Sequence, residues 1–370
     1  MKFGLFGGAF DPLHNEHVDI IQLARKAANL DALIIVPSHN PPHKDKDLAP
    51  FKNRIEMLRL FAKDKPYIII DSIENSLSKA DSYAYEIIPE LINKYGGDLV
   101  YIIGGDSLVD FDTWKRPDLI LKQIPLLVFS RLSYNELELK ARDCLLAKHG
   151  GTIEVLGYGG NGISSSTIKA QIETGFIKDA MIPESIKDYI LQNNLYNTFN
   201  YYVNKLKTNI SQERFEHSAR TAIYATSFCT KLGLNYKDVF LASLLHDCAK
   251  EIEPLSPITS YNVPYKVIHQ FDGKIIAEDV YGIKNPDILD AIEYHTTGKP
   301  RMSTIGKLIY ASDKLEPDRY FVGIEEIRKL IVKDFDKGFL KLLKKTTEFL
   351  LDKKITLDPS TKDAYDYYLK

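Results

Sequence analysis

Short apolar runs alternate with amphipathic stretches through the first half of the chain. Runs of consecutive apolar residues predict six β-strands, at residues 2–6, 32–36, 67–71, 99–103, 126–129 and 152–156. Apolar residues at helical spacing predict helices at residues 17–29, 51–62, 83–94, 119–123 and 135–148, with closing helices at 164–174 and 183–193. Continuously apolar strands alternating with helices are typical of a parallel sheet covered on both faces. We therefore expect a doubly wound, Rossmann-like α/β domain.

The pattern changes after residue 197, beyond which no run predicts a strand. Apolar residues at helical spacing predict helices at 213–232, 236–250, 274–281, 286–295, 304–314, 324–333 and 337–352, separated by glycines and prolines. The second half is therefore expected to be an all-α domain. We place the two domains at residues 1–198 and 199–370, and no Gly/Ser-rich or Pro-rich linker marks the boundary.

Composition narrows the classes of partner. The 370 residues include 48 Lys and Arg against 50 Asp and Glu, a balance that argues against a nucleic-acid-binding surface or a polybasic membrane anchor. The 3 cysteines form no CxxC pair, which fits a reducing compartment and argues against a disulfide scaffold. No apolar run approaches the ~18 residues of a membrane helix, and the start lacks a signal-peptide cleavage site. We expect a soluble, cytoplasmic protein without nucleic-acid or membrane partners.

The turn after the first predicted strand is a candidate phosphate site. It reads GGAFDPLHNEH, beginning at Gly7 and ending at His17. Gly7 and Gly8 allow backbone N–H groups to approach a phosphate closely, and the following helix N-terminus favours an anion. His14 and His17 are three residues apart, so they lie on one helical face and can contact one phosphate chain. A tight turn with two structural histidines and a metal-binding histidine pair are the alternatives.

Three further segments are candidates for nucleotide contacts. GISSSTIK, at residues 162–169, has hydroxyls at a helix start followed one turn later by Lys169, which suits an oligophosphate. Taken alone, this serine cluster is more typical of a helix N-cap. PPHK, at residues 41–44, places a stiff turn beside a histidine and a lysine. Asp106 follows two glycines at the end of the fourth predicted strand, where doubly wound sheets bind ligands, although aspartate is also a common turn residue.

Together these segments resemble the nucleotidyltransferase superfamily with the (H/T)xGH signature, specifically the bacterial nicotinate mononucleotide adenylyltransferases (NadD type). The resemblance covers roughly residues 1–197 and rests on GGAFDPLHNEH, VPSHNPPHK, RIEMLRL, GGDSL, Trp114-Lys115, Arg131 and ISSSTIK, in this order. It implies transfer of AMP from Mg²⁺-bound ATP to nicotinate mononucleotide, a reaction that needs positioning and charge stabilisation. It assigns catalysis to His14, His17, Lys44 and Lys169, and nucleotide binding to Gly7, Gly8, His43, Asp106, Trp114, Arg131, Ser164 and Ser165.

Three positions depart from the pattern of that family. Glu16 stands where HxGH has glycine, Lys169 replaces an arginine and its bidentate fork, and Ala84 lacks a hydroxyl used near the pyridine carboxylate. We still expect a preference for nicotinate over nicotinamide mononucleotide. Residues 157–162 also match G-x-G-x-x-G, but this turn closes the predicted sheet instead of opening it, so a dehydrogenase-type dinucleotide site is disfavoured. Trp114 and ISSSTIK argue against a phosphopantetheine adenylyltransferase.

Histidines and aspartates recur on the predicted helices of the second half. His217 lies on the first of them, the pair His246-Asp247 ends an apolar run, and Asp313 ends another. A lone histidine or aspartate at such a place is usually structural. Two imidazoles with two carboxylates suit a divalent ion with open positions for water and phosphate. A closed zinc site is disfavoured because no thiolate lies nearby in the sequence.

This second pattern resembles the HD-domain metal-dependent phosphohydrolases, more narrowly the YqeK-type group, to which symmetrical hydrolysis of diadenosine tetraphosphate to two ADP is assigned. The resemblance covers roughly residues 200–355 and rests on RxxH, LHDxxK, IH, YHTTG and SDKLEPxR. It implies a divalent metal, iron or alternatively manganese, held by His217, His246, Asp247 and Asp313. It implies polyphosphate contacts from Arg214, Lys250, His269, His295, Thr296 and Arg319, with His295 outside the ligand set.

The sequence therefore predicts a bifunctional enzyme whose partners are small nucleotides: ATP, nicotinate mononucleotide and diadenosine tetraphosphate. The alternative is the same adenylyltransferase carrying a non-catalytic, nucleotide-sensing HD domain. Self-association is left open.

Overall fold

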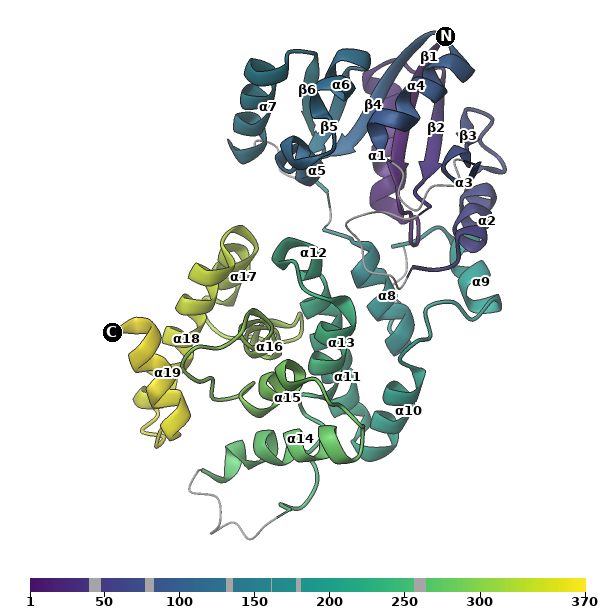
Figure 1. Ribbon diagram of the computed structural model, residues 1–370. Helices are drawn as coiled ribbons and strands as arrows, with labels where there is room; N and C mark the ends of the chain where they lie inside the picture. The colour runs from purple at the N-terminus through teal and green to yellow at the C-terminus, as the bar shows by residue number, and fades with distance from the viewer. Residues whose placement is uncertain (40–47, 77–82, 131–135, 161, 178–180, 256–263) are drawn as a thin grey trace. The chain divides into compact units, whose positions relative to one another are not determined.

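The computed structural model describes residues 1–39, 48–76, 83–130, 136–160, 162–177, 181–255 and 264–370 (Figure 1). The chain divides into two compact units, Met1–Ile168 with Lys178–Tyr196, and Lys169–Ile177 with Asn197–Lys370. The helix at Ser165–Thr174 therefore begins in the first unit and ends in the second. The predicted domain boundary after residue 198 lies close to Tyr196, where the first unit ends. As a domain boundary it stays a prediction.

A six-stranded parallel sheet forms the centre of the first unit (Figure 1). Its strands are β1 (Lys2–Gly8), β2 (Ala32–Pro37), β3 (Ile68–Ile70), β4 (Asp98–Gly104), β5 (Leu126–Ser130) and β6 (Ile153–Gly157), and their order is β3-β2-β1-β4-β5-β6. Leu5 of β1 pairs with Ile34 of β2 on one side and with Tyr101 of β4 on the other. The winding direction thus reverses between β1 and β4, and the crevice outside their carboxyl ends is the expected ligand site.

Helices pack against this sheet because its strands are apolar on both faces. All six residues of β2 are buried, as expected for a central parallel strand. Leu5, Ile34 and Tyr101 belong to one apolar cluster with side chains from α4 (Ala84–Tyr95), α6 (Pro117–Gln123) and α7 (Glu136–His149). Other helices of this unit are α1 (Asn15–Ala27), α2 (Phe51–Ala62), α3 (Ile73–Ser76), α5 (Gly105–Val109) and α9 (Glu184–Gln192), with a 3-10 turn η1 at Phe111–Thr113, and α8 (Ser165–Thr174) is divided between the two units.

The second unit is helical throughout the residues that the structure describes. Its helices are α10 (Asn200–Asn209), α11 (Gln212–Thr226), α12 (Cys229–Leu232), α13 (Tyr236–Leu245), α14 (Ile268–Asp279), α15 (Pro286–Glu293), α16 (Thr304–Leu315), α17 (Ile324–Lys333), α18 (Phe335–Asp352) and α19 (Pro359–Leu369), with a 3-10 turn η3 at Tyr265–Val267. One continuous apolar core joins them, and helices α11, α13 and α16 contact one another inside it. This arrangement confirms the expected order of a parallel α/β domain followed by an all-α domain.

Several predicted helix boundaries in the second unit were wrong. The helix predicted at 213–232 divides into α11 and α12, and the one predicted at 236–250 ends at Leu245, where i to i+3 bonds from Cys248 to Leu245 and from Lys250 to Asp247 replace helical ones. The helix predicted from 274 begins at Ile268, because its first turns bury polar residues that break the apolar pattern. Helices α10 and α19 were missed, since each buries only two residues.

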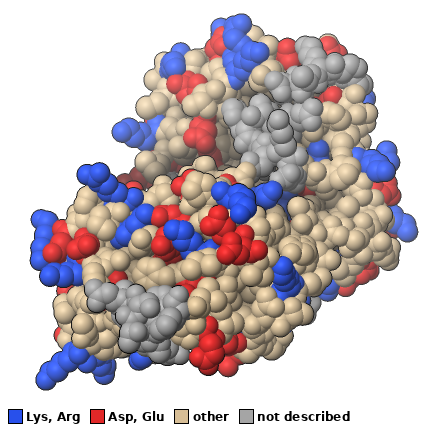
Figure 2. All heavy atoms as spheres, turned by 60° about the horizontal axis from the view of Figure 1, so that its bottom comes forward, with Lys and Arg blue, Asp and Glu red and all other residues tan. Residues whose placement is uncertain are grey.

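Figure 2 shows basic and acidic side chains interspersed over the face that it draws. This distribution fits the nearly balanced counts of basic and acidic residues in the sequence. Among the described residues, no helix is long and apolar enough to cross a membrane.

Candidate active sites

The first candidate site lies at the carboxyl ends of β1 and β4. Gly7 and Gly8 end β1, and Gly104 ends β4, directly before α5, whose first turn carries Asp106. A Cβ added to Gly105 would overlap the buried carboxylate of Glu138 on α7, which would then have to move. The glycines thus lie where the strand order reverses, and their predicted role in phosphate binding stays a prediction.

His14 and His17 form the N-terminal cap of α1. His14 is the N-cap residue, its backbone N–H donates to Nδ1 of His17 at 3.2 Å, and the two rings stack with centroids 3.7 Å apart. Because Nδ1 of His17 accepts this bond, a neutral His17 carries its proton on Nε2, the form that can donate to a phosphate oxygen. The pair therefore has a structural role in capping, which does not conflict with the predicted role in phosphate binding.

The serine segment before α8 also has a local role. Ser164 caps the helix, since its Oγ accepts from the backbone N–H of Thr167 at 3.1 Å. Ser165 opens α8, and Lys169 follows one turn later. The buried carboxylate of Glu16, on α1, accepts from the backbone N–H of Ile163 at 3.0 Å. Glu16 thus connects the start of α1 with the start of α8.

Trp114 sits in an aromatic group beyond α5. Its ring centroid lies 4.8 Å from that of Phe111 and 6.4 Å from that of Tyr101 on β4. The next residue, Lys115, places Nζ 4.1 Å from the ring centroid of Tyr83, the residue before α4. Trp114 is half-buried, so one part of its ring is packed while another part is accessible to a planar ligand.

Arg54, on α2, has a role that the sequence analysis did not assign. This fully buried guanidinium donates to four backbone carbonyls: Ala9 after β1, Ser38 and His39 after β2, and Ala49 before α2. Burial lowers its pKa from the ordinary value, although nearby Asp11 opposes that effect. The only signal for Arg54 in the sequence was its place in the motif RIEMLRL. Of the other predicted residues of this site, His43, Lys44 and Arg131 lie outside the described residues.

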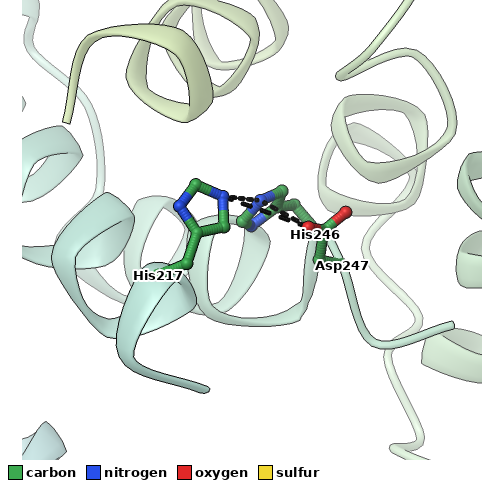
Figure 3. A group of neighbouring side chains, drawn as sticks. All are labelled: His217, His246 and Asp247. Carbon is green, nitrogen blue, oxygen red and sulfur yellow. Dashed lines mark hydrogen bonds and ion pairs between the residues drawn. The ribbon is translucent and has the colours of Figure 1, made fainter. Parts of the chain in front are cut away.

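The second candidate site is a cluster of buried imidazoles and carboxylates (Figure 3). His217 projects from α11, and His246 and Asp247 follow the end of α13. Nε2 of His217 lies 3.2 Å from Nε2 of His246, 4.0 Å from Oδ2 of Asp247 and 3.0 Å from Oδ1 of Asp313 on α16. Nε2 of His246 lies 3.7 Å from Asp247 and 3.6 Å from Asp313. The structure thus brings all four predicted metal ligands together.

A second donor group shares Asp247 with the first. The second carboxylate oxygen of Asp247, Oδ1, lies 3.4 Å from Nε2 of His269 and 3.3 Å from Nε2 of His295. These two nitrogens are 3.2 Å apart. Both groups of three could hold a metal ion. The sequence analysis assigned His269 and His295 to polyphosphate and placed His295 outside the ligand set. Those roles stay predictions, and the geometry favours a ligand role for both histidines.

Hydrogen bonds fix the ring orientation of three of these histidines. Nδ1 of His246 donates to the Ser243 carbonyl at 2.6 Å, and Nδ1 of His295 donates to the Ile292 carbonyl at 2.8 Å. Nδ1 of His217 lies 3.2 Å from Oε1 of Glu316, a residue that the sequence analysis did not single out. A carbonyl can only accept, so the neutral rings of His246 and His295 present the lone pair of Nε2 to the cluster.

The pKa shifts of Asp247 and His269 agree with a ligand role. Burial raises the pKa of Asp247, but His246 and His295 outweigh it and hold the pKa well below its usual range. Burial and the neighbouring His295 lower the pKa of His269 to about 2. The carboxylate is therefore ionised and the imidazole neutral at neutral pH, the states that metal coordination requires. Burial lowers the pKa of His217, yet bonds to Asp313 and Glu316 raise it on balance.

Cationic side chains surround the cluster. Arg214 donates to Oδ2 of Asp247 at 2.8 Å, and Arg319 donates to Oδ1 of Asp313 at 3.0 Å. Lys250 Nζ lies 3.0 Å from Nε2 of His269, and Thr296 Oγ1 lies 3.2 Å from the same atom. Lys314, not assigned by the sequence analysis, donates to the His295 carbonyl at 2.9 Å. The predicted polyphosphate-binding residues therefore lie together, and their role in binding polyphosphate stays a prediction.

The donor set fits a divalent ion. An ion about 2.1 Å from each ligand atom holds neighbouring ligands about 3.0–3.5 Å apart, and the separations in the two groups are 3.0–4.0 Å and 3.2–3.4 Å. Mixed imidazole and carboxylate ligands suit a transition metal, and the cluster contains no thiolate among the described residues. Cys248 directs its thiol to the Gly273 carbonyl instead, and burial raises its pKa.

The chain resembles known proteins over both units. It matches the cytidylyltransferase-like family over residues 5–171 and the HD domain family over residues 214–318. A protein of Mycoplasma genitalium named "Probable nicotinate-nucleotide adenylyltransferase/Ap4A hydrolase" is 26% identical over 95% of this chain and 99% of its own length. A "Probable nicotinate-nucleotide adenylyltransferase" of Clostridium acetobutylicum is 38% identical over 53% of this chain and 98% of its own length.

Among solved structures, a "predicted HD superfamily hydrolase involved in NAD metabolism" from Clostridium acetobutylicum is 32% identical. The match covers 46% of this chain and 97% of that chain, with a TM-score of 0.43. The match to the Mycoplasma genitalium relative covers 95% of this chain and therefore spans both units. The chain belongs to the nicotinate-nucleotide adenylyltransferase family, in the form that carries an HD domain as its second half.

Proposed function

We propose that this chain is a bifunctional nucleotide enzyme. The first unit transfers AMP from Mg²⁺-bound ATP to nicotinate mononucleotide, giving nicotinate adenine dinucleotide and pyrophosphate. The second unit hydrolyses diadenosine tetraphosphate symmetrically to two ADP with a divalent metal. The relative of Mycoplasma genitalium, aligned over 95% of this chain, is named for both activities. The two candidate sites described above give each activity its own residues.

In the transferase, a phosphate oxygen of the mononucleotide attacks the α-phosphorus of ATP, and the bond from that phosphorus to the bridging oxygen of pyrophosphate breaks. His14 and His17 lie at the start of α1, beside the Gly7-Gly8 end of β1, where they can donate to the phosphates. Ser165 and Lys169 supply a hydroxyl and a cation at the start of α8. These groups stabilise the charge on the transferring phosphoryl group and orient it, which is the main contribution of a protein to this reaction.

The accessible part of Trp114 suits stacking on the pyridine ring, and Asp106 suits a ribose hydroxyl. Lys115 follows Trp114 and lies over the Tyr83 ring, so its ammonium is close to where a pyridine carboxylate would sit beside that tryptophan. A cation there favours nicotinate over nicotinamide mononucleotide. We therefore propose the acid as the preferred substrate, although Ala84 lacks the hydroxyl found in the family.

The hydrolase proposal rests chiefly on one observation: the two oxygens of Asp247 face two separate pairs of histidines. His217, His246, Asp247 and Asp313 would hold one ion, and Asp247, His269 and His295 a second. A metal bound there would lower the pKa of a bound water and neutralise phosphoryl oxygens. Arg214, Lys250, Lys314 and Arg319 offset the negative charge of the polyphosphate, and Glu316 orients His217.

We propose iron as the physiological metal, with manganese as the alternative, because mixed imidazole and carboxylate ligands suit both ions. The nucleotide substrates and the free thiols of Cys144, Cys229 and Cys248 fit the cytoplasm. A non-catalytic, nucleotide-sensing HD domain is the second candidate function. It is disfavoured because a domain that has lost its chemistry has no need of two complete donor groups at buried positions.

The test is product analysis with the full chain. Incubation with Mg²⁺, ATP and each pyridine mononucleotide should give the acid dinucleotide and pyrophosphate, faster than the amide dinucleotide. Incubation with diadenosine tetraphosphate and iron or manganese should give two ADP. Formation of ATP and AMP would overturn the symmetrical cut. No hydrolysis with either metal, despite nucleotide binding, would favour the sensing domain.

A further inference from the structure

The loop between α16 and α17 carries the most exposed large hydrophobic side chain that the structure describes. Tyr320 is 87% exposed, and Val322, two residues later, is 79% exposed. Phe321 between them packs against the core of the second unit. The side chains of Tyr320 and Val322 are thus exposed to solvent, whereas that of Phe321 packs against the core and anchors the other two residues.

The backbone before Tyr320 is held firmly despite that exposure. The guanidinium of Arg328 on α17 donates to the carbonyls of Leu315 at 3.0 Å, Glu316 at 2.6 Å and Arg319 at 3.0 Å. The backbone N–H of Arg319 donates to the Glu316 carbonyl at 3.0 Å. An aromatic ring on a loop fixed this way loses little conformational freedom when a ligand packs on it.

This loop borders the metal-ligand cluster through Arg319. The guanidinium of Arg319 lies 3.0 Å from Oδ1 of Asp313 and 3.2 Å from Nε2 of His217, while its side chain is 43% exposed. Arg319 therefore reaches from the buried ligands to solvent. Tyr320 is the residue after Arg319, and its exposed ring starts from a Cα about 3.8 Å from that of Arg319.

We infer that Tyr320, with Val322 beside it, is the surface on which a purine base of the substrate stacks in the second unit. This inference rests on the proposed hydrolase function and adds to it the feature that separates a dinucleoside polyphosphate from a bare polyphosphate. Both ligands present a chain of phosphates to the metal ligands and the cations, and only the dinucleoside carries bases, so recognition of a base needs a separate surface. An exposed ring contacts the base alone, and stacking accepts any base because every base has a π-face.

The test compares ligands that share phosphates but differ in the base. In the full-length, metal-loaded protein, Tyr320→Ala should raise the KM for diadenosine tetraphosphate about tenfold, the effect of losing one stacked base. Tyr320→Phe keeps the ring and should stay within about twofold of wild type. Inhibition by inorganic tripolyphosphate should change less than twofold in either variant. Tyr201→Ala removes another exposed tyrosine of the same unit and should leave both the KM and the inhibition by tripolyphosphate unchanged.

Calorimetry with ADP and with pyrophosphate gives a readout independent of turnover. Only ADP binding should weaken in Tyr320→Ala, and the nucleotide site of the first unit contributes equally in every variant. An unchanged KM in Tyr320→Ala, or equal weakening of the phosphate-only ligands, overturns the inference. If wild type leaves diadenosine tetraphosphate intact while Tyr320→Ala still weakens ADP binding, the proposed hydrolase function fails and the base-stacking surface stands.

Discussion

Glu16 accepts a hydrogen bond from the backbone N–H of Ile163 at 3.0 Å, across 147 positions of sequence. Both residues are buried, Glu16 in the first turn of α1 and Ile163 just before α8. The bond joins the two helix starts that carry the histidine pair and the serine segment. The carboxylate that stands where the family has glycine is thus an anchor between the two proposed phosphate-binding segments.

Removing that anchor should weaken ATP binding. Glu16→Ala leaves the Ile163 N–H without its acceptor, which costs about 1–3 kcal/mol of stability. We expect the KM for ATP to rise about tenfold, because the start of α8 loses its fixed position. Glu16→Gln keeps a carbonyl oxygen and should retain most of the affinity. Initial rates over a range of ATP concentrations, with melting curves, measure both effects, and indistinguishable Ala and Gln variants would contradict the anchoring role.

The sequence predicted the fold of the first unit well because its signal is local. Each strand is a short run rich in apolar residues, and the positions of all six agree with the structure to within two residues. The second unit was predicted less well where polar side chains are buried. His269, Gln270 and Asp272 break the apolar pattern of α14, so its first turns were missed.

The candidate site was likewise predictable only where its residues belong to a local sequence pattern. Motifs in the sequence singled out His217, His246, Asp247 and Asp313, which the structure brings together, and their role as metal ligands stays a prediction. The connections between distant segments were not predictable, because a bond such as that between Nδ1 of His217 and the carboxylate of Glu316 has no local pattern. Arg54 is the clearest case, since a lone arginine on an amphipathic helix is expected to be exposed, whereas this one is buried against four carbonyls.

The shared carboxylate of Asp247 predicts a specific pattern of metal loss. Asp247→Ala removes a ligand from both donor groups. The affinity for metal and the rate of hydrolysis should therefore each fall at least about 100-fold. His295→Ala removes a ligand from the second group alone and should lower the metal content from two ions toward one per chain. His149→Ala, in the first unit, is the control. Metal analysis after gel filtration decides, and wild-type metal content in His295→Ala would return that histidine to a role outside the ligand set.

Glu173 predicts a pH dependence of stability. Its carboxylate accepts from the backbone N–H groups of Thr198 and Phe199 at 2.9 and 3.1 Å, at the start of α10. Burial raises its pKa to about 7, although both bonds and Lys169 oppose that shift. The folded chain therefore binds this proton more tightly than the unfolded chain. Its stabilising contribution is fully present below the unfolded pKa of 4.5 and is lost as the pH rises through about 7.

The matching experiment compares wild type with Glu173→Gln, which cannot titrate. Relative to the variant, wild type should lose stability between pH 4.5 and 7, on the order of 3 kcal/mol in all. Denaturant unfolding at several pH values gives this difference directly, since other titrating groups are common to both proteins. A difference that stays constant across the range would show that Glu173 has an ordinary pKa.

Substitution of Arg54 can separate the contribution of its guanidinium hydrogen bonds from that of its positive charge. Its guanidinium spans the segment after β1, the segment after β2 and the entry to α2, and lysine cannot make four such bonds with one ammonium group. Arg54→Lys keeps the charge but leaves buried carbonyls unpaired, so we expect a loss of about 2–4 kcal/mol in the stability of this unit. Transferase activity should fall as well, because Ala9 lies between the glycine turn and His14.

Arg59→Lys is the matched control on the same helix, with a side chain 65% exposed, and should change stability by less than about 0.5 kcal/mol. Denaturant unfolding of the two variants, followed by transferase rates under conditions where both are folded, separates lost stability from lost positioning. Equal effects of the two substitutions would mean that charge alone, and not the fork of Arg54, holds these segments together.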